Sequence, residues 1–212
     1  MTLKKTKIIE NPELLINAGN PKGKLGEELI NDMNVNHENL AQWGVSHLNI
    51  SKESVILDIG CGGGVNVKRF LEMTDNNVYG IDYSLLSVKK SSELNIDEIL
   101  SQRCEIRHES VSQMSFDDNT FDIITAFETV YFWPDLLQSF REVYRVLKPG
   151  GAFFICNESN GETNKDDKWT NIIDGMTIYN AKQLQDILQK AGFTKIRTEK
   201  NDKGWLCVNA EK

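Results

Sequence analysis

The sequence predicts an α/β fold in which helices cover both faces of a mostly parallel sheet. Apolar segments of strand length alternate with segments of helical periodicity between residues 55 and 209. The first apolar segment, residues 55–59, runs into four glycines within five residues, and a helical pattern follows at once. The last two strand segments are joined by a turn around residues 202–204, which is too short for anything but an antiparallel pair.

Each element of the predicted sheet has its own pattern. Near-continuous apolar or β-branched runs predict strands at residues 55–59, 77–82, 103–108, 121–127, 152–157, 193–199 and 205–209. Periodic apolar positions predict helices at residues 65–71, 85–100, 136–147 and 180–191. Residues 148–151, Lys-Pro-Gly-Gly, predict a turn that ends the third of these helices and aims the fifth strand.

Length and charge restrict the class of protein. A chain of 212 residues and 24.1 kDa can bury a full core as one domain. The net charge of −7 disfavours a nucleic-acid partner, which would require a basic face. Four scattered cysteines without a C-x-x-C pair are typical of reduced thiols. The chain shows no secretory signal pattern and no membrane-spanning apolar run, so a cytoplasmic location is expected, with the oligomeric state left open.

The glycine turn after the first strand predicts a ligand site. Glycine allows sharp turns and leaves no Cβ between the backbone and a ligand. The turn fits the dinucleotide fingerprint poorly, because Val65 stands where glycine or alanine is needed. Asp58 precedes Gly60 by two residues, and its carboxylate would repel a pyrophosphate but would suit a ligand with ammonium and sulfonium groups.

Residues 57–64, Leu-Asp-Ile-Gly-Cys-Gly-Gly-Gly, resemble the first motif of the class I S-adenosylmethionine-dependent methyltransferases. Residues 147–151, Leu-Lys-Pro-Gly-Gly, are similar to a second marker of that family. The resemblance covers about residues 55–209 and implies a Rossmann-like, doubly wound, seven-stranded sheet with a C-terminal antiparallel hairpin and N-terminal helices. It also implies S-adenosylmethionine as the cofactor, S-adenosylhomocysteine as the product, and cofactor contacts at Asp58, Gly60, Cys61, Gly62 and Phe127.

Asp82 is the expected ribose ligand. It ends the second strand 22 residues after Gly60, close to the spacing of about 20 residues at which an acid accepts both ribose hydroxyls. NAD enzymes share that spacing, so Asp82 indicates adenosine without selecting the cofactor. Asp82 or Ser84 could instead cap the next helix, and both roles are compatible. By resemblance Tyr83 would cover the adenine, although it could equally be a packed aromatic residue.

The stretch after the third strand is expected to border the adenine. Aligned on Phe116 and residues 121–122, an Asp-Ala pair of the family falls on Ser110 and Val111. The resemblance implies that Ser110 accepts from the adenine amino group while the Val111 backbone N–H reaches a ring nitrogen. Serine in place of the acid is a departure from the family, because its hydroxyl can accept this bond only without charge.

The residues expected on the acceptor side follow no motif as clear as those of the cofactor side. Residues 128–135 follow the fourth strand and contain three consecutive aromatic residues, which could flank a sulfonium or start the next helix as an apolar plug. We expect Trp133 to be structural, Tyr131 to face the site, and Glu128 to lie near the cofactor's ammonium group or the acceptor. Glu128, Tyr131 and His37 are candidate general bases, needed only if the acceptor must lose a proton.

Three regions are expected within one structural domain: an arm at residues 1–23, a helical lid at residues 24–50, and the cofactor-binding domain at residues 51–212. The lid would break near residues 34–36. Met33 and His37 in the lid, Tyr131, and Trp169 in a polar stretch at residues 158–178 are the candidate acceptor contacts. The lid could equally be a set of helices that simply pack on the sheet.

The predicted function is methyl transfer from S-adenosylmethionine to a small-molecule acceptor, with no metal and no membrane or nucleic-acid partner. The first alternative is a non-catalytic module that binds S-adenosylmethionine, because Asp58, the glycine turn and Asp82 would serve a sensor equally well. The second is an NAD-dependent oxidoreductase, which Asp58, Val65 and the terminal hairpin oppose. The acceptor itself cannot be read from these motifs.

Overall fold

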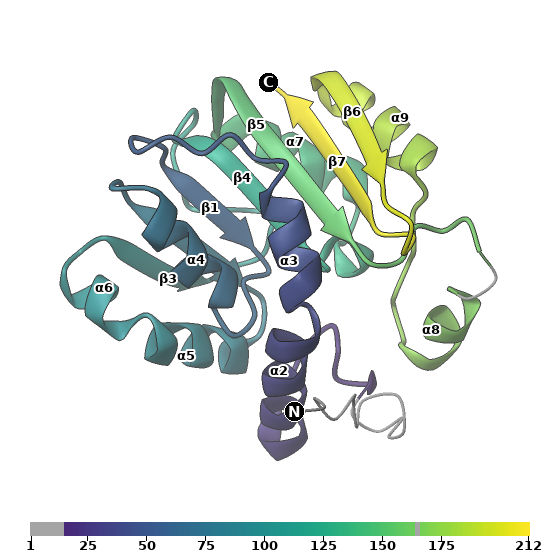
Figure 1. Cartoon of the computed structure of the whole chain (residues 1–212), viewed down its shortest axis with the longest axis horizontal. Coiled ribbons are helices and arrows are strands. Elements are labelled where there is room, and N and C mark those ends of the chain that lie inside the picture. The colour runs from purple at the N-terminus through teal and green to yellow at the C-terminus, as the bar shows by residue number, and fades with distance from the viewer. Residues whose placement is uncertain (1–14, 164–165) are drawn as a thin grey trace.

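A seven-stranded sheet forms the centre of the molecule (Figure 1). The computed structural model describes residues 15–163 and 166–212. In these ranges the strands are β1 (Ile56–Ile59), β2 (Val78–Asp82), β3 (Cys104–His108), β4 (Phe121–Phe127), β5 (Leu147–Asn157), β6 (Thr194–Lys200) and β7 (Leu206–Glu211). Their order across the sheet is β3-β2-β1-β4-β5-β7-β6.

The direction of pairing confirms the predicted fold class. Strands β1 to β5 pair in parallel, whereas β7 runs antiparallel to both β5 and β6. The order of strands reverses between β1 and β4. At such a switch point the carboxyl ends of neighbouring strands leave a crevice where ligands bind. The sheet therefore locates the candidate site beyond the ends of β1 and β4.

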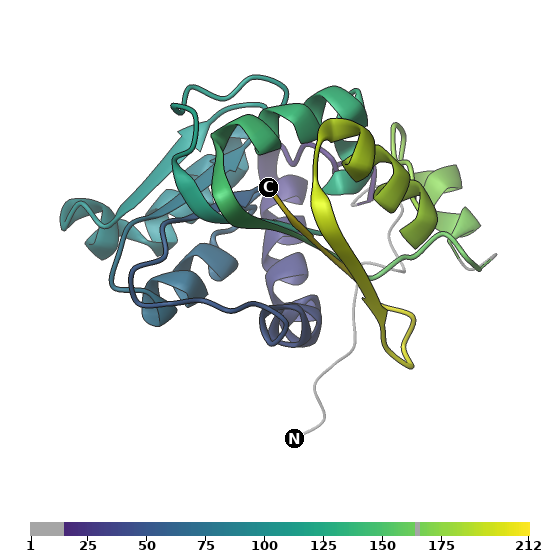
Figure 2. The same ribbon diagram turned by 90° about the horizontal axis from the view of Figure 1, so that it is seen from above.

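Helices cover both faces of this sheet. They are α2 (Gly23–Asn36), α3 (Glu38–Val45), α4 (Val65–Met73), α5 (Leu85–Leu94), α6 (Ile96–Leu100), α7 (Leu136–Val146), α8 (Asp167–Ile172) and α9 (Ala181–Ala191). The core cluster with α3 and α4 lies on one face and the cluster with α7 and α9 on the other (Figure 2). Successive residues of β5 alternate between the two clusters, as the pleat of a strand buried on both faces requires. No helix in the described ranges is both long and apolar enough to cross a membrane.

Most predicted boundaries lie within two residues of the observed ones, but two elements differ more. The expected helix at residues 85–100 is split into α5 and α6 at Asn95, a buried residue whose amide donates to the carbonyl oxygens of Gly64 at 3.2 Å and Ser91 at 2.9 Å. Strand β5 begins at Leu147 rather than at residue 152, because Leu147 pairs with Phe121 before the register shifts. The predicted turn at residues 148–151 therefore lies within β5 as an irregularity of the strand.

The N-terminal helices lie against the glycine turn. The predicted break near residues 34–36 is found at His37, between α2 and α3. The Asn34 side chain fills the space that a Cβ on Gly63 would need. The segment just before α2 is attached to α5, since the Ser84 hydroxyl donates to the Pro21 carbonyl at 2.7 Å. These contacts suit a lid, but the division into arm, lid and domain stays a prediction, and most of the arm lies outside the described residues.

Candidate functional site

The glycine turn leaves open space at one position. Gly62 has a φ of +52°, and a Cβ built on it would meet no atom within 4 Å. Its backbone N–H donates to Asp82 Oδ2 at 2.9 Å, which ties the turn after β1 to the end of β2. Gly60 is also held against β2, because its N–H donates to the Ile81 carbonyl at 2.8 Å. The turn is thus fixed by the sheet while its outer side stays accessible to a ligand.

Asp58 is almost completely buried, with 2% of its surface exposed. The Thr125 hydroxyl of the neighbouring strand β4 donates to its Oδ1 at 2.7 Å. Burial raises the pKa of Asp58 to about 7, and the hydrogen bond from Thr125 pulls that pKa down. A ligand with a positive charge beside this carboxylate would favour its ionised form, as the sequence-based interpretation requires.

Both oxygens of Asp82 are held by backbone groups. Besides the Gly62 bond to Oδ2, the Ser84 N–H donates to Oδ1 at 2.8 Å. Burial raises the pKa of Asp82, while these two hydrogen bonds lower it. The Ser84 hydroxyl accepts from the Ser87 N–H and so caps α5, which leaves Asp82 itself free of the capping role. The local geometry orients the carboxylate beside the glycine turn.

The expected adenine side is open. The Tyr83 side chain is 63% exposed, and its ring centroid lies 6.5 Å from that of His108. Ser110 lies in a short turn, where its oxygen accepts from the Ser112 N–H at 3.3 Å, and Val111 is buried in the core. The chain after β3 is joined to the end of β2, since the Glu109 N–H donates to the Asp82 carbonyl at 3.2 Å. Tyr83 and Ser110 are thus on the same side of the site as Asp82.

Cys61 and Phe127 were expected to contact the cofactor, yet their side chains pack in the core. The Cys61 thiol lies 3.7 Å from the Ser91 hydroxyl, and the Phe127 ring packs against Phe70 and Phe154. These side chains therefore support the turn and the end of β4. Any cofactor contact at these two positions would have to come from the backbone.

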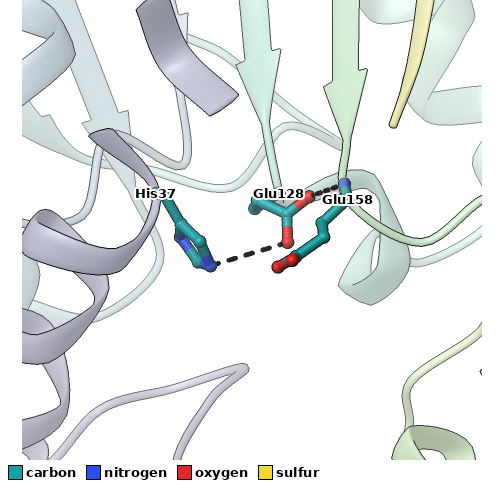
Figure 3. A group of neighbouring side chains, drawn as sticks. All are labelled: His37, Glu128 and Glu158. Carbon is teal, nitrogen blue, oxygen red and sulfur yellow. Dashed lines mark hydrogen bonds and ion pairs between the residues drawn. The ribbon is translucent and has the colours of Figure 1, made fainter. Parts of the chain in front are cut away.

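The turn after β4 brings together the three candidate bases. Figure 3 shows two of them, His37 and Glu128. Glu128 is the first residue after the strand and has a φ of +62°. The Tyr131 hydroxyl donates to Glu128 Oε1 at 3.2 Å, and His37 Nε2 lies 3.8 Å from Glu128 Oε2. Tyr131 is buried at 3% exposure, whereas the Glu128 side chain is 17% exposed. Trp133, expected to be structural, stacks on Phe153.

Burial is the main cause of the pKa shifts of Glu128, His37 and Tyr131. It raises the pKa of Glu128 to about 8; the hydrogen bond from the Glu158 N–H opposes that shift, and the charge of the Glu158 carboxylate adds to it. Burial lowers the pKa of His37, against the opposing effect of the Glu158 charge. Burial also raises the pKa of Tyr131 well above its usual value. At neutral pH the imidazole is therefore neutral and can accept a proton.

The two remaining acceptor candidates are positioned differently. Met33 lies one helical turn before His37, and its carbonyl accepts the His37 N–H. Trp169 belongs to α8, which Figure 1 shows beside the sheet rather than over the crevice. Lys168 Nζ lies 4.2 Å from the centroid of the Trp169 ring. Met33 is thus close in the chain to the group at Glu128, whereas Trp169 is engaged with its own helix.

Sequence reasoning missed three residues of this region. Glu158 follows β5 as Glu128 follows β4, and that parallel placement after strands could have identified it. Thr125 lies inside an apolar run, so only the pairing of β1 with β4 reveals its bond to Asp58. Asn34 meets Gly63 through a contact between distant segments, for which the sequence carries no local signal.

Part of the chain matches a known family of protein domains. Residues 57–155 match the family model described as a methyltransferase domain. The chain is 34% identical over 108 residues to a sterol 24-C-methyltransferase of Aspergillus fumigatus, a match that covers 51% of this chain and 29% of the relative. It is 28% identical over 146 residues to phosphoethanolamine N-methyltransferase 2 of Caenorhabditis elegans, covering 68% of this chain and 33% of that protein. The matches thus span about a third of the length of these two relatives.

Solved structures share the fold. Phosphoethanolamine N-methyltransferase 2 of Haemonchus contortus, solved with S-adenosylhomocysteine, has a TM-score of 0.77 at 16% identity and is matched over 93% of this chain and 59% of its own. The cyclase SpnF has a TM-score of 0.68 at 18% identity, with 92% of this chain and 85% of the other covered. With the sheet order, these likenesses lead to one conclusion: residues 57–155 match a methyltransferase domain, and the chain has the fold of solved S-adenosylmethionine-dependent methyltransferases.

Proposed function

We propose that the protein transfers the methyl group of S-adenosylmethionine to a small-molecule acceptor. The observation that carries the proposal is the glycine turn at the switch point, with open space at Gly62 and the Asp82 carboxylate bound to its backbone. In this proposal Asp82 accepts from the ribose hydroxyls, Tyr83 and Ser110 border the adenine, and Asp58 balances the positive charge of the amino-acid end. The small-molecule acceptor would enter beside Glu128.

In this reaction the protein mainly positions the methyl donor and the acceptor, and it need not supply a nucleophile of its own. The methyl group of a sulfonium is already activated, so an acceptor atom attacks in line and the neutral thioether leaves. Holding two reactants in this geometry can supply about 7–11 kcal/mol of the barrier. If the acceptor must lose a proton, His37 is the preferred base, because burial lowers its pKa and keeps the imidazole neutral. Tyr131 would orient Glu128 through their hydrogen bond.

The acceptor class is inferred from charge and from relatives. Relatives of this chain are named for sterols and for phosphoethanolamine, which are small molecules. The net charge of −7 disfavours a polymer with a phosphate backbone. These two observations support a small-molecule acceptor and leave its identity to experiment.

A non-catalytic module that binds S-adenosylmethionine is the second candidate. Asp58, the glycine turn and Asp82 would serve binding without turnover equally well, so these residues do not separate the two functions. Formation of S-adenosylhomocysteine in the presence of an acceptor would exclude the non-catalytic role. Binding of S-adenosylmethionine without turnover of any acceptor would favour it.

Calorimetric titration of the full chain with S-adenosylmethionine, S-adenosylhomocysteine and NAD tests the cofactor. We expect both sulfur compounds to bind with one site per chain and NAD to give no heat of binding. The exposed substitution Glu72→Gln should leave both affinities unchanged and serves as the control. Binding of NAD in place of the sulfur compounds would contradict the proposal.

A further inference from the structure

One histidine and two glutamates converge beyond the crevice. The ligand atoms of His37, Glu128 and Glu158 all lie within 4.8 Å of one another. The residues come from three distant segments: the end of α2, the residue after β4 and the residue after β5. Figure 3 shows the imidazole directed at the Glu128 carboxylate, with the Glu158 carboxylate beside it. An imidazole with two carboxylates is a mixed nitrogen and oxygen donor set, as found at metal centres.

Glu128 is held so that one oxygen remains available. Its Oε1 accepts from the Glu158 backbone N–H and from the Tyr131 hydroxyl. Its Oε2 is the atom that faces His37 Nε2. A metal-binding carboxylate is commonly oriented in this way, with neighbouring donors bound to the oxygen that does not coordinate.

The two carboxyl groups of the cluster have no lysine or arginine partner in the described part of the chain. In the described ranges, no lysine or arginine forms an ion pair with Glu128 or Glu158. The Glu128 side chain is only 17% exposed, and burying a carboxylate next to a second one is unfavourable unless a cation accompanies them.

We propose that His37, Glu128 and Glu158 bind one divalent first-row transition-metal ion. Ligand atoms lie about 2.0–2.2 Å from such an ion, so two of them can be at most about 4.4 Å apart. His37 Nε2 and Glu128 Oε2, 3.8 Å apart, meet this limit, and rotation of the exposed Glu158 side chain can bring its carboxylate within it. The mixed donor set suits transition metals: the imidazole favours Zn²⁺, and the two carboxylates also suit Mn²⁺, whereas Mg²⁺ and Ca²⁺ prefer oxygen ligands alone.

Three protein ligands would leave coordination positions for water or for an oxygen of the acceptor. Coordination of an acceptor oxygen by the ion rests on the proposed function, whereas ion binding itself does not. A bound ion would occupy the His37 nitrogen that could otherwise accept a proton. The roles of His37 as ligand and as base are therefore mutually exclusive, and metal titration distinguishes them.

The test is calorimetric titration of the full chain, stripped with a chelator, with Mn²⁺, Zn²⁺ and Mg²⁺. We expect one site per chain for Mn²⁺ and Zn²⁺ and much weaker binding of Mg²⁺. His37→Gln and Glu158→Gln should each weaken the binding at least about tenfold. The matched controls His47→Gln and Glu72→Gln replace a second histidine and an exposed glutamate outside the cluster, and they should bind the ions like the unsubstituted protein.

Repeating the titration on the S-adenosylhomocysteine complex separates this proposal from the previous one. Retained ion binding, lost in the cluster variants, supports the metal site. Absence of ion binding overturns it, as does binding that His37→Gln and Glu158→Gln leave unchanged. Loss of the ion upon saturation with S-adenosylhomocysteine also overturns it, because the cluster would then belong to the cofactor. Failure of S-adenosylhomocysteine to bind at all would contradict the proposed function instead.

Discussion

The ribose side and the transfer side of the crevice each place a carboxylate at the carboxyl end of a strand, but they are built differently. Asp82 on the ribose side is bound by the N–H groups of Gly62 and Ser84, which belong to the local strand–turn–helix units. Glu128 on the transfer side meets His37 and Glu158 from distant parts of the chain. The difference teaches that the proposed cofactor contacts are held by local motifs, whereas the proposed acceptor side is a tertiary assembly.

The largest effect is expected at the glycine turn. Gly62→Val should abolish cofactor binding, with a loss of more than a hundredfold by calorimetry, because its side chain enters the open space beside Asp82. The strain of a left-handed residue should lower stability by only about 1–2 kcal/mol. Gly150→Val is a matched control, since Gly150 also has a positive φ and open surroundings but lies in the β5 irregularity. Equal binding by the two variants would show that the turn does not cradle the cofactor.

Asp82→Ala should produce the second-largest effect and tests the ribose side. Charge-assisted hydrogen bonds are worth about 1.5–3 kcal/mol each, so we expect S-adenosylhomocysteine affinity to fall about a hundredfold. Asp75→Ala removes an exposed aspartate whose ion pair with Lys52 lies on the surface, and it should bind normally. Unchanged affinity of Asp82→Ala would remove this residue from the site.

Glu128→Gln tests the transfer side through stability. The pKa of Glu128 is raised from 4.5 to about 8 in the folded protein, so folding takes up a proton between these values. Stability is consequently present at acid pH and lost as pH rises toward 8. Glu128→Gln should remove this decline, by on the order of 4 kcal/mol between pH 5 and pH 9. Urea unfolding at the two pH values measures it, and the same decline in both proteins would contradict the assigned pKa.

The smallest effect concerns the adenine edge. Ser110→Asp restores the acid that the family resemblance expects, and an ionised acceptor forms the stronger hydrogen bond. We expect cofactor affinity to rise by about threefold to tenfold, whereas Ser110→Ala should weaken it slightly. Calorimetry on both variants decides whether Ser110 borders the adenine. If neither substitution alters affinity, the alignment of Ser110 with the family acid is wrong.

The succession of strands along the chain and the position of the glycine turn could be predicted because they depend on local patterns. Apolar runs, turn glycines and the short turn at residues 202–204 act over a few residues each. The break at Asn95 could not be predicted, because its buried amide bonds to Gly64, which belongs to another segment. The start of β5 likewise depended on pairing between Leu147 and Phe121.

By itself the sequence determined the sheet, the glycine turn, and Asp58 and Asp82 at strand ends, because hydrophobic periodicity and glycine conformation act locally. Only the tertiary structure decided that Thr125 would bond to Asp58 and that His37 and Glu158 would meet at Glu128. Those contacts join segments from 30 to 121 residues apart in the chain. Burial and electrostatic interactions at such contacts depend on the packed arrangement, which no short stretch of sequence encodes.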